Sequence, residues 1–79
     1  MGNTKQQIYQ IISEALDVDI NLIHEGLSIG DIPEWDSVGN LTIISHLEEK
    51  LGIEIPLDNL FEMTTVENIF QVVKKIKNE

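Results

Sequence analysis

Apolar residues recur at helical spacing in three separate segments of the chain, and this pattern restricts the chain to a helical fold. In the first segment they step along one face of a helix: Ile8, Ile11, Ile12, Ala15 and Leu16. In the second segment, a helix with about 100° per residue places five apolar residues on one broad arc, which is expected to face the core: Leu41, Ile43, Ile44, Leu47 and Leu51. The last segment carries a third stripe, formed by Val66, Ile69, Phe70, Val73 and Ile76. We therefore expect three long helices around one core.

A capping signal places the start of the first helix. Thr4 with Gln7 fits a capping box, and Asn3 is an alternative cap. The helix is therefore expected from about residue 4 to residue 16.

The second helix carries signals at both ends. It is expected to begin at Asp36-Ser37, and Asp36 can cap it by reaching toward the amide of Gly39. It is expected to end near Leu51, because Gly52 suits the position that follows a helix.

Two further helix starts are expected in the last third of the chain. Asp58 fits the cap of a short helix over residues 59–62. Thr64 and Glu67 form a second capping box that opens the last helix. The final turns of that helix hold cations that complement the helix dipole: Lys74, Lys75 and Lys77.

Residues 17–36 show no clean period, yet a structureless stretch of this length is unusual in a compact domain. We expect a long loop, with a short helical turn, that is pinned to the core by Ile20, Leu22, Leu27, Ile29, Ile32 and Trp35. Trp35 is expected to anchor the approach to Ser37. The expected fold is all-α: a small four-helix bundle, three helices long and one short, in which a long loop joins the first two helices. It forms a single domain over residues 1–79.

Composition narrows the functional classes. The 79 residues include no cysteine, so thiol chemistry must be imported on a cofactor. The formal net charge of −9 argues against nucleic acid and favours partners with a basic surface, although high solubility alone also accounts for it. No apolar run is long enough for a membrane span or a signal peptide. We therefore expect a cytoplasmic monomer that does not insert into membranes.

Two metal signals fail on inspection. Asp17, Asp19 and Asn21 mimic the first ligands of a calcium loop, but Leu22 replaces the required glycine and Ser28 replaces the bidentate glutamate. The two histidines of the chain have no partner at metal-ligand spacing. No metal site is expected.

A catalytic centre is not expected either. His46 is expected on the outward, solvated side of the second helix, and adjacent helical residues such as Ser45 and His46 point in different directions. A nucleophile and its base must be in hydrogen-bond contact. The chain is therefore not expected to be an enzyme.

Ser37 is the candidate site for chemistry. It lies in the first turn of the second helix, where unpaired amides and the helix dipole favour a phosphodiester. An Asp-Ser pair before an apolar helix is also a common capping pair, and the two interpretations are compatible. Val38, Thr42, Ser45 and Glu49 form a stripe on the side away from the core, so Val38 is a candidate contact for a partner.

Three stretches resemble the acyl carrier protein family: Glu34-Trp35-Asp36-Ser37-Val38-Gly39-Asn40-Leu41, the run from Leu47 to Pro56, and Thr64-Thr65-Val66. The resemblance extends from about Leu16 to Ile76. It implies that Ser37, in a motif with Asp36, receives 4′-phosphopantetheine from coenzyme A through a separate phosphopantetheinyl transferase. The terminal thiol would then present acyl or aminoacyl thioesters to loading and transferring enzymes. The second helix would be the docking surface, with Val38, Glu48 and Glu49 as contacts.

The chain departs from carriers of the fatty-acid type. Gly39 and Thr42 stand where those proteins often have acidic residues, and Ser45 stands in place of a methionine. The docking face is thus expected to be less acidic and less apolar, and the run from Glu34 to Asn40 is more similar to stand-alone carriers of specialised or surface-polysaccharide pathways. The alternative is an unmodified acidic helical module for protein interaction, which would share the bundle but lack the arm.

Overall fold

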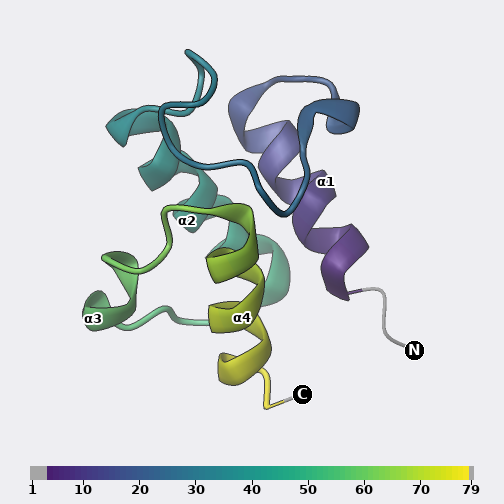
Figure 1. Cartoon of the computed structure of the whole chain (residues 1–79). Helices are drawn as coiled ribbons and strands as arrows, with labels where there is room; N and C mark the ends of the chain where they lie inside the picture. Colours follow the sequence, from purple (N-terminus) through teal and green to yellow (C-terminus); the bar gives the residue numbers. More distant parts are fainter. Residues whose placement is uncertain (1–3, 79) are drawn as a thin grey trace.

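The computed structural model describes residues 4–78, which form an all-α fold. In chain order the elements are α1 (Thr4–Leu16), the 3-10 turn η1 (Ile20–Leu22), α2 (Ser37–Leu51), α3 (Leu57–Leu60) and α4 (Val66–Ile76). Figure 1 shows three long helices and the short α3, with a long loop between α1 and α2. Within residues 4–78, extended pairing is limited to one isolated antiparallel bridge between Ser28 and Thr65. The expected fold class is confirmed.

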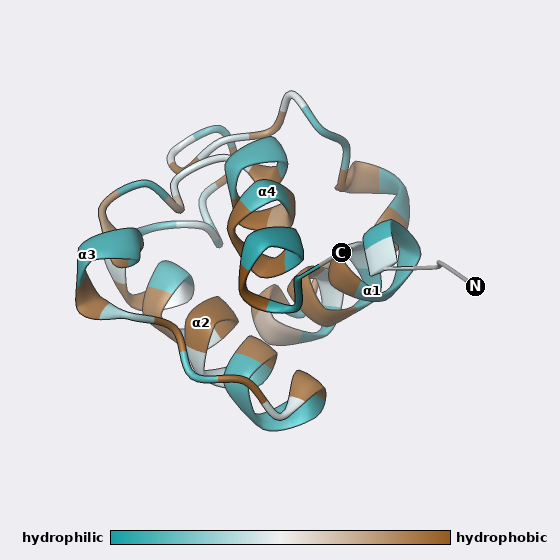
Figure 2. Cartoon of the chain, turned by 90° about the horizontal axis from the view of Figure 1, so that it is seen from below, coloured by the Kyte–Doolittle hydropathy of each residue, from teal (hydrophilic) through white to brown (hydrophobic). Residues whose placement is uncertain are grey.

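The core lies where α1, α2 and α4 meet. α1 packs most extensively against α2 and less extensively against α4. In Figure 2 the hydrophobic parts of these three helices gather toward the centre of the molecule, and hydrophilic parts face outward. The largest fully buried side chains are Trp35, Ile8, Ile12, Ile43, Leu47, Met63, Ile69, Val66 and Val73.

The two longest helices have the bounds that the capping signals predict. α1 begins at Thr4, and its alternative cap, Asn3, lies outside the described residues. The end of α2 is set by Gly52, whose φ of 64° is in the left-handed region that glycine adopts without steric cost.

The α3 and α4 starts differ from the expected ones. α3 begins directly after Pro56, so Asp58 lies inside its first turn and does not cap it. Thr65, not Thr64, caps α4, because the Thr65 hydroxyl accepts a hydrogen bond of 3.0 Å from the amide of Asn68. Thr64 instead uses its carbonyl to accept a bond from the amide of Ile29, which ties the long loop to the start of α4.

The buried face of α4 is rotated from the expected stripe. Val72, which was not in the stripe, is buried, whereas Phe70 and Ile76 are only partly buried. Phe70 lies at the edge of the core, with the ammonium groups of Lys5 and Lys74 each 5.8 Å from its ring centroid. Two cations therefore cover the ring where the core ends.

The long loop is held to the core by fewer side chains than expected. Trp35 and Leu27 are buried, but Leu22 is 47% exposed, and the buried residue in this region is Ile23. The carboxylate of Asp19 caps η1, and this turn directs Leu22 outward and Ile23 inward. Ile20, Ile29 and Ile32 are partly buried. Backbone bonds from Ile29 to Thr64 and from Val66 to Leu27, both 2.9 Å, hold the loop against α4.

Candidate functional site

The amino end of α2 is built around the Asp36 cap. Asp36 is extended, its carboxylate accepts a hydrogen bond of 2.8 Å from the amide of Gly39, and its carbonyl accepts one from the amide of Asn40. This arrangement satisfies the third amide of the helix and leaves those of Ser37 and Val38 without an intrahelical acceptor. The positive end of the helix dipole is therefore directed at whatever occupies the space beside Ser37.

Ser37 is the first residue of α2 and is exposed. Among residues 4–78, its hydroxyl has no hydrogen-bond partner. An open hollow of about 440 Å³ adjoins it, and its walls include Ile29, Ile32 and Pro33 from the long loop. The hydroxyl is thus accessible to another molecule, and the unpaired amides suit a phosphate ester on its oxygen.

Trp35 holds the residues on either side of Ser37 together. Its ring is fully buried, and its indole Nε1 donates a hydrogen bond of 2.9 Å to Asn40 Oδ1 in the first turns of α2. Its carbonyl accepts a bond of 2.8 Å from the amide of Gly30. The role of Trp35 as an anchor is confirmed, whereas Asn40 as its partner was not anticipated. A buried indole N–H usually has a hydrogen-bond acceptor, and the nearby Asn40 was the available signal.

Gly39 allows the loop to approach α2 closely. A Cβ atom at this position would collide with the backbone carbonyl oxygen of Glu34 and would lie 3.0 Å from Leu16 Cδ2. An acidic side chain there would have to displace the loop. The departure from fatty-acid-type carriers at Gly39 therefore has a packing cause, independent of docking.

The exposed face of α2 is more apolar than expected. Val38 is 70% exposed, as its place on the helix predicted, but Leu41, expected in the core, is 62% exposed. Leu41 lies at the edge of the predicted arc, whereas the core buries Ile43, Ile44 and Leu47 and partly buries Leu51. Because Leu41 follows Val38 by three positions and Ser37 by four, the three residues share one helix face.

The two glutamates predicted as partner contacts differ in their surroundings. Glu49 is exposed. Glu48 is partly buried, and its Oε2 accepts a hydrogen bond of 3.0 Å from the amide of Ile55, so it holds the α2–α3 connection in place. Glu48 therefore already has a structural function within the chain, and its contact with a partner stays a prediction.

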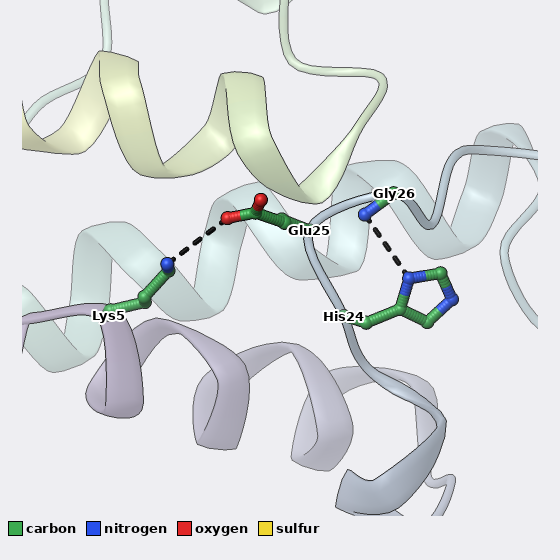
Figure 3. A network of polar contacts seen from close by, with 4 residues as sticks. All are labelled: Lys5, His24, Glu25 and Gly26. Carbon is green, nitrogen blue, oxygen red and sulfur yellow. Dashed lines mark hydrogen bonds and ion pairs between the residues drawn. The ribbon is translucent and has the colours of Figure 1, made fainter.

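His46 was wrongly expected to be a solvated surface residue. It is partly buried, and its Nδ1 is a buried atom with no hydrogen-bond partner within the described part of the chain. His24 is exposed, and its Nδ1 accepts a bond of 3.2 Å from the amide of Gly26 (Figure 3). In residues 4–78 no three His, Asp or Glu side chains gather where they could hold a metal ion.

An ion pair ties the long loop to α1. Lys5 Nζ lies 3.1 Å from Glu25 Oε2 (Figure 3). The hydrogen bond from Lys5 to this carboxylate, together with its negative charge, raises the pKa of the Lys5 ammonium above its ordinary value of 10.5. Both side chains are more than half exposed, so solvent weakens the contribution of this pair to stability.

Comparison with known proteins identifies the family of the chain. A family model described as "Phosphopantetheine attachment site" matches residues 6–73. The chain is 28% identical over 75 residues to the acyl carrier protein of Sinorhizobium fredii (strain NBRC 101917 / NGR234). It has the same identity over the same length to the acyl carrier protein AcpP of Rhizobium meliloti (strain 1021). Each match covers 95% of this chain and 96% of the relative.

Of the helices described, none has the length and apolar character needed to cross a membrane.

Proposed function

The chain belongs to the family of proteins with a phosphopantetheine attachment site, and from this membership we propose that Ser37 is the residue that carries the arm. The protein is an acyl carrier protein with covalently bound 4′-phosphopantetheine as its cofactor. The assignment to Ser37 rests on one observation: its exposed hydroxyl lies at the amino end of α2, beside two unpaired amides.

Attachment is a phosphoryl transfer in which the chain supplies the nucleophile. The Ser37 oxygen bonds to the phosphorus that bears the pantetheine group of coenzyme A, and the bond from that phosphorus to the bridging oxygen of the diphosphate breaks. Adenosine 3′,5′-bisphosphate leaves, and the hydroxyl proton passes to a base of the transferase. The bound group supplies a terminal thiol for thioester formation. The chain itself presents the hydroxyl, and its Ser37 and Val38 amides stabilise the phosphate charge.

Mass spectrometry tests the attachment site. The purified chain is incubated with coenzyme A and a broad-specificity phosphopantetheinyl transferase, and one arm should be added per chain. Ser37→Ala should abolish the addition without loss of helicity by circular dichroism. The matched control is Ser28→Ala, which removes a loop hydroxyl while the Ser28 amide still donates to Asp31. Continued labelling of Ser37→Ala would refute the assignment.

We propose that partners dock on the exposed face of α2 beside Ser37. This face offers Val38 and Leu41 as apolar contacts and Glu49, with Glu48 at its edge, as acidic ones. The partners would be a phosphopantetheinyl transferase and enzymes that load or transfer acyl or aminoacyl groups. The net charge of −9 would speed encounter with a basic surface, so high salt should slow association. Association that is indifferent to salt would contradict this component.

We propose that the chain serves a specialised or surface-polysaccharide pathway, as the run from Glu34 to Asn40 suggests. The packing cause found for Gly39 removes one of its supports, so the proposal now rests on Thr42, Ser45 and the other residues of that run. Mass spectrometry of the native thioester tests it, because an aminoacyl or unusual acyl cargo supports it and a series of ordinary fatty acyl chains refutes it.

The family match favours the carrier over an unmodified interaction module, in which the exposed Val38 and Leu41 would serve docking alone. Intact mass of the chain purified from its own host, with active transferase present, separates the two functions. We further propose a single-domain, cytoplasmic monomer that carries cargo without catalysing its reactions. One hydrophobic core formed by all the long helices supports the single domain.

A further inference from the structure

Two side chains form a bridge across Ser37. Trp35 precedes the serine by two positions and Asn40 follows it by three, and the indole Nε1 of Trp35 donates to Asn40 Oδ1 over 2.9 Å. The bond closes a short loop that contains the whole Asp36 cap. Both of its ends are restrained, because the Trp35 ring is fully buried and Asn40 belongs to α2. The bond thus fixes the end of the long loop to the helix that it enters.

Backbone contacts extend this bracing on both sides of Trp35. The Trp35 amide donates to the carbonyl of Ile32 over 3.1 Å, and the Trp35 carbonyl accepts from Gly30 over 2.8 Å. On the helix side, the Gly39 amide is held by the Asp36 carboxylate, and the missing Cβ of Gly39 admits the Glu34 carbonyl. Ser37 is consequently an exposed residue inside a segment whose neighbours are restrained.

We propose that Trp35 and Asn40 are positioning residues for the modification of Ser37. Their hydrogen bond fixes the backbone on both sides of Ser37, and with it the position from which the hydroxyl projects, so the transferase does not have to order this segment itself. Preorganisation of this kind acts on rate, because reaction needs the oxygen within about 3–3.5 Å of the attacked atom and correctly aligned. The inference rests on the proposed attachment at Ser37.

A purely structural function of the bond makes a different prediction. If the bond only stabilised the fold, a folded variant without it would be modified as fast as the wild type. If the bond positions Ser37, the folded variant is modified slowly at saturating carrier concentration, while KM changes little because the docking side chains Val38 and Leu41 are unaltered. The split between kcat and KM therefore separates the two functions.

The test measures steady-state modification of the full chain by a phosphopantetheinyl transferase with coenzyme A. Asn40→Leu removes the acceptor at similar volume and should lower kcat about tenfold, with KM within about twofold, under conditions where circular dichroism shows a folded chain. Asn40→Asp keeps an acceptor oxygen and should restore kcat to within about twofold of the wild type. Thr65→Ala is the stability control: it removes the α4 cap and should leave kcat unchanged.

A second variant covers the case in which Asn40→Leu unfolds. Trp35→Phe removes the donor but retains an aromatic ring, and should lower kcat to a similar extent. Where both single variants fold, the double variant should be no slower than the slower single one, since each removes the same bond. Trp35 is the sole tryptophan, so fluorescence quenching by acrylamide should increase in Asn40→Leu if the ring is released.

The outcomes separate this inference from the proposed function. Wild-type kcat in folded Asn40→Leu or Trp35→Phe would overturn the positioning function, while loss of labelling in Ser37→Ala would still uphold the attachment site. A fall in kcat that Asn40→Asp does not rescue, or that Thr65→Ala reproduces, would also overturn it. Labelling that persists in Ser37→Ala would instead refute the proposed site.

Discussion

Gly39→Ala tests the close approach of the loop to α2. In an open helix this change would stabilise the chain by up to about 1 kcal/mol, because alanine is the better helix former. Here the added Cβ meets the backbone carbonyl of Glu34, which cannot rotate away as a side chain can, and Leu16 Cδ2 at 3.0 Å. Overpacking of this kind costs about 1–3 kcal/mol. Displacement of the loop would also weaken the Asp36 cap, and loss of such a cap lowers stability by about 1 kcal/mol.

Together these opposing contributions lower the free energy of unfolding of Gly39→Ala by about 1–3 kcal/mol. For a domain of this size, each kcal/mol lowers the Tm by roughly 4–8 °C, so the expected decrease is about 5–20 °C. Thermal unfolding followed by circular dichroism measures it. Ser45→Ala, an exposed change in the same helix, is the control and should alter stability by less than about 0.5 kcal/mol. An unchanged or higher Tm for Gly39→Ala would refute the packing argument.

Four further substitutions follow from the contacts at other positions. Gly52→Ala forces a left-handed φ of 64° on a residue with a Cβ and should destabilise the chain by about 1 kcal/mol in urea, although open space surrounds the site. Val38→Asp or Leu41→Asp should leave stability within about 0.5 kcal/mol and raise the transferase KM, measured with Thr65→Ala as the comparison. The Lys5–Glu25 pair raises the pKa of Lys5, so its stabilisation is present below pH 10.5 and lost as the pH rises through the higher folded pKa. Lys5→Met should abolish this alkaline loss in pH-dependent unfolding, and an unchanged alkaline profile would count against the pair.

Local signals in the sequence were sufficient to predict the helix ends that are fixed by residues close to the end itself. The Asp36 cap and the left-handed Gly52 both act within one helical turn of the ends of α2, and both were identified from residue type and spacing. Thr64 and Thr65 show the limit of such signals, because either residue can cap a helix. The loop decided between them by engaging the Thr64 carbonyl, a contact between residues distant in the sequence.

Contacts across the chain account for what sequence patterns missed at the site. The need for glycine at position 39 depends on the carbonyl of Glu34, and the orientation of Asn40 depends on where the Trp35 ring enters the core. No repeat or residue spacing in the sequence reveals either of these two contacts. Ser37 could be found because its signal is local: a hydroxyl in the first turn after a capping aspartate.

The exposure of Leu41 has a consequence for docking. A helical wheel gives the direction of a side chain but not how far the neighbouring helices extend. The core of this small domain buries Ile43, Ile44 and Leu47 of α2 and partly buries Leu51. Leu41 is left exposed on the face that bears Val38 and Ser37, so this face offers apolar contacts as well as acidic ones. The two kinds of contact are expected to have different kinetic effects. Charge chiefly governs the association rate, and desolvated apolar contact chiefly governs dissociation. We therefore expect salt to lower the association rate with a partner enzyme, and Leu41→Ala to raise the dissociation rate with little change in association. An effect of Leu41→Ala confined to association would refute this division.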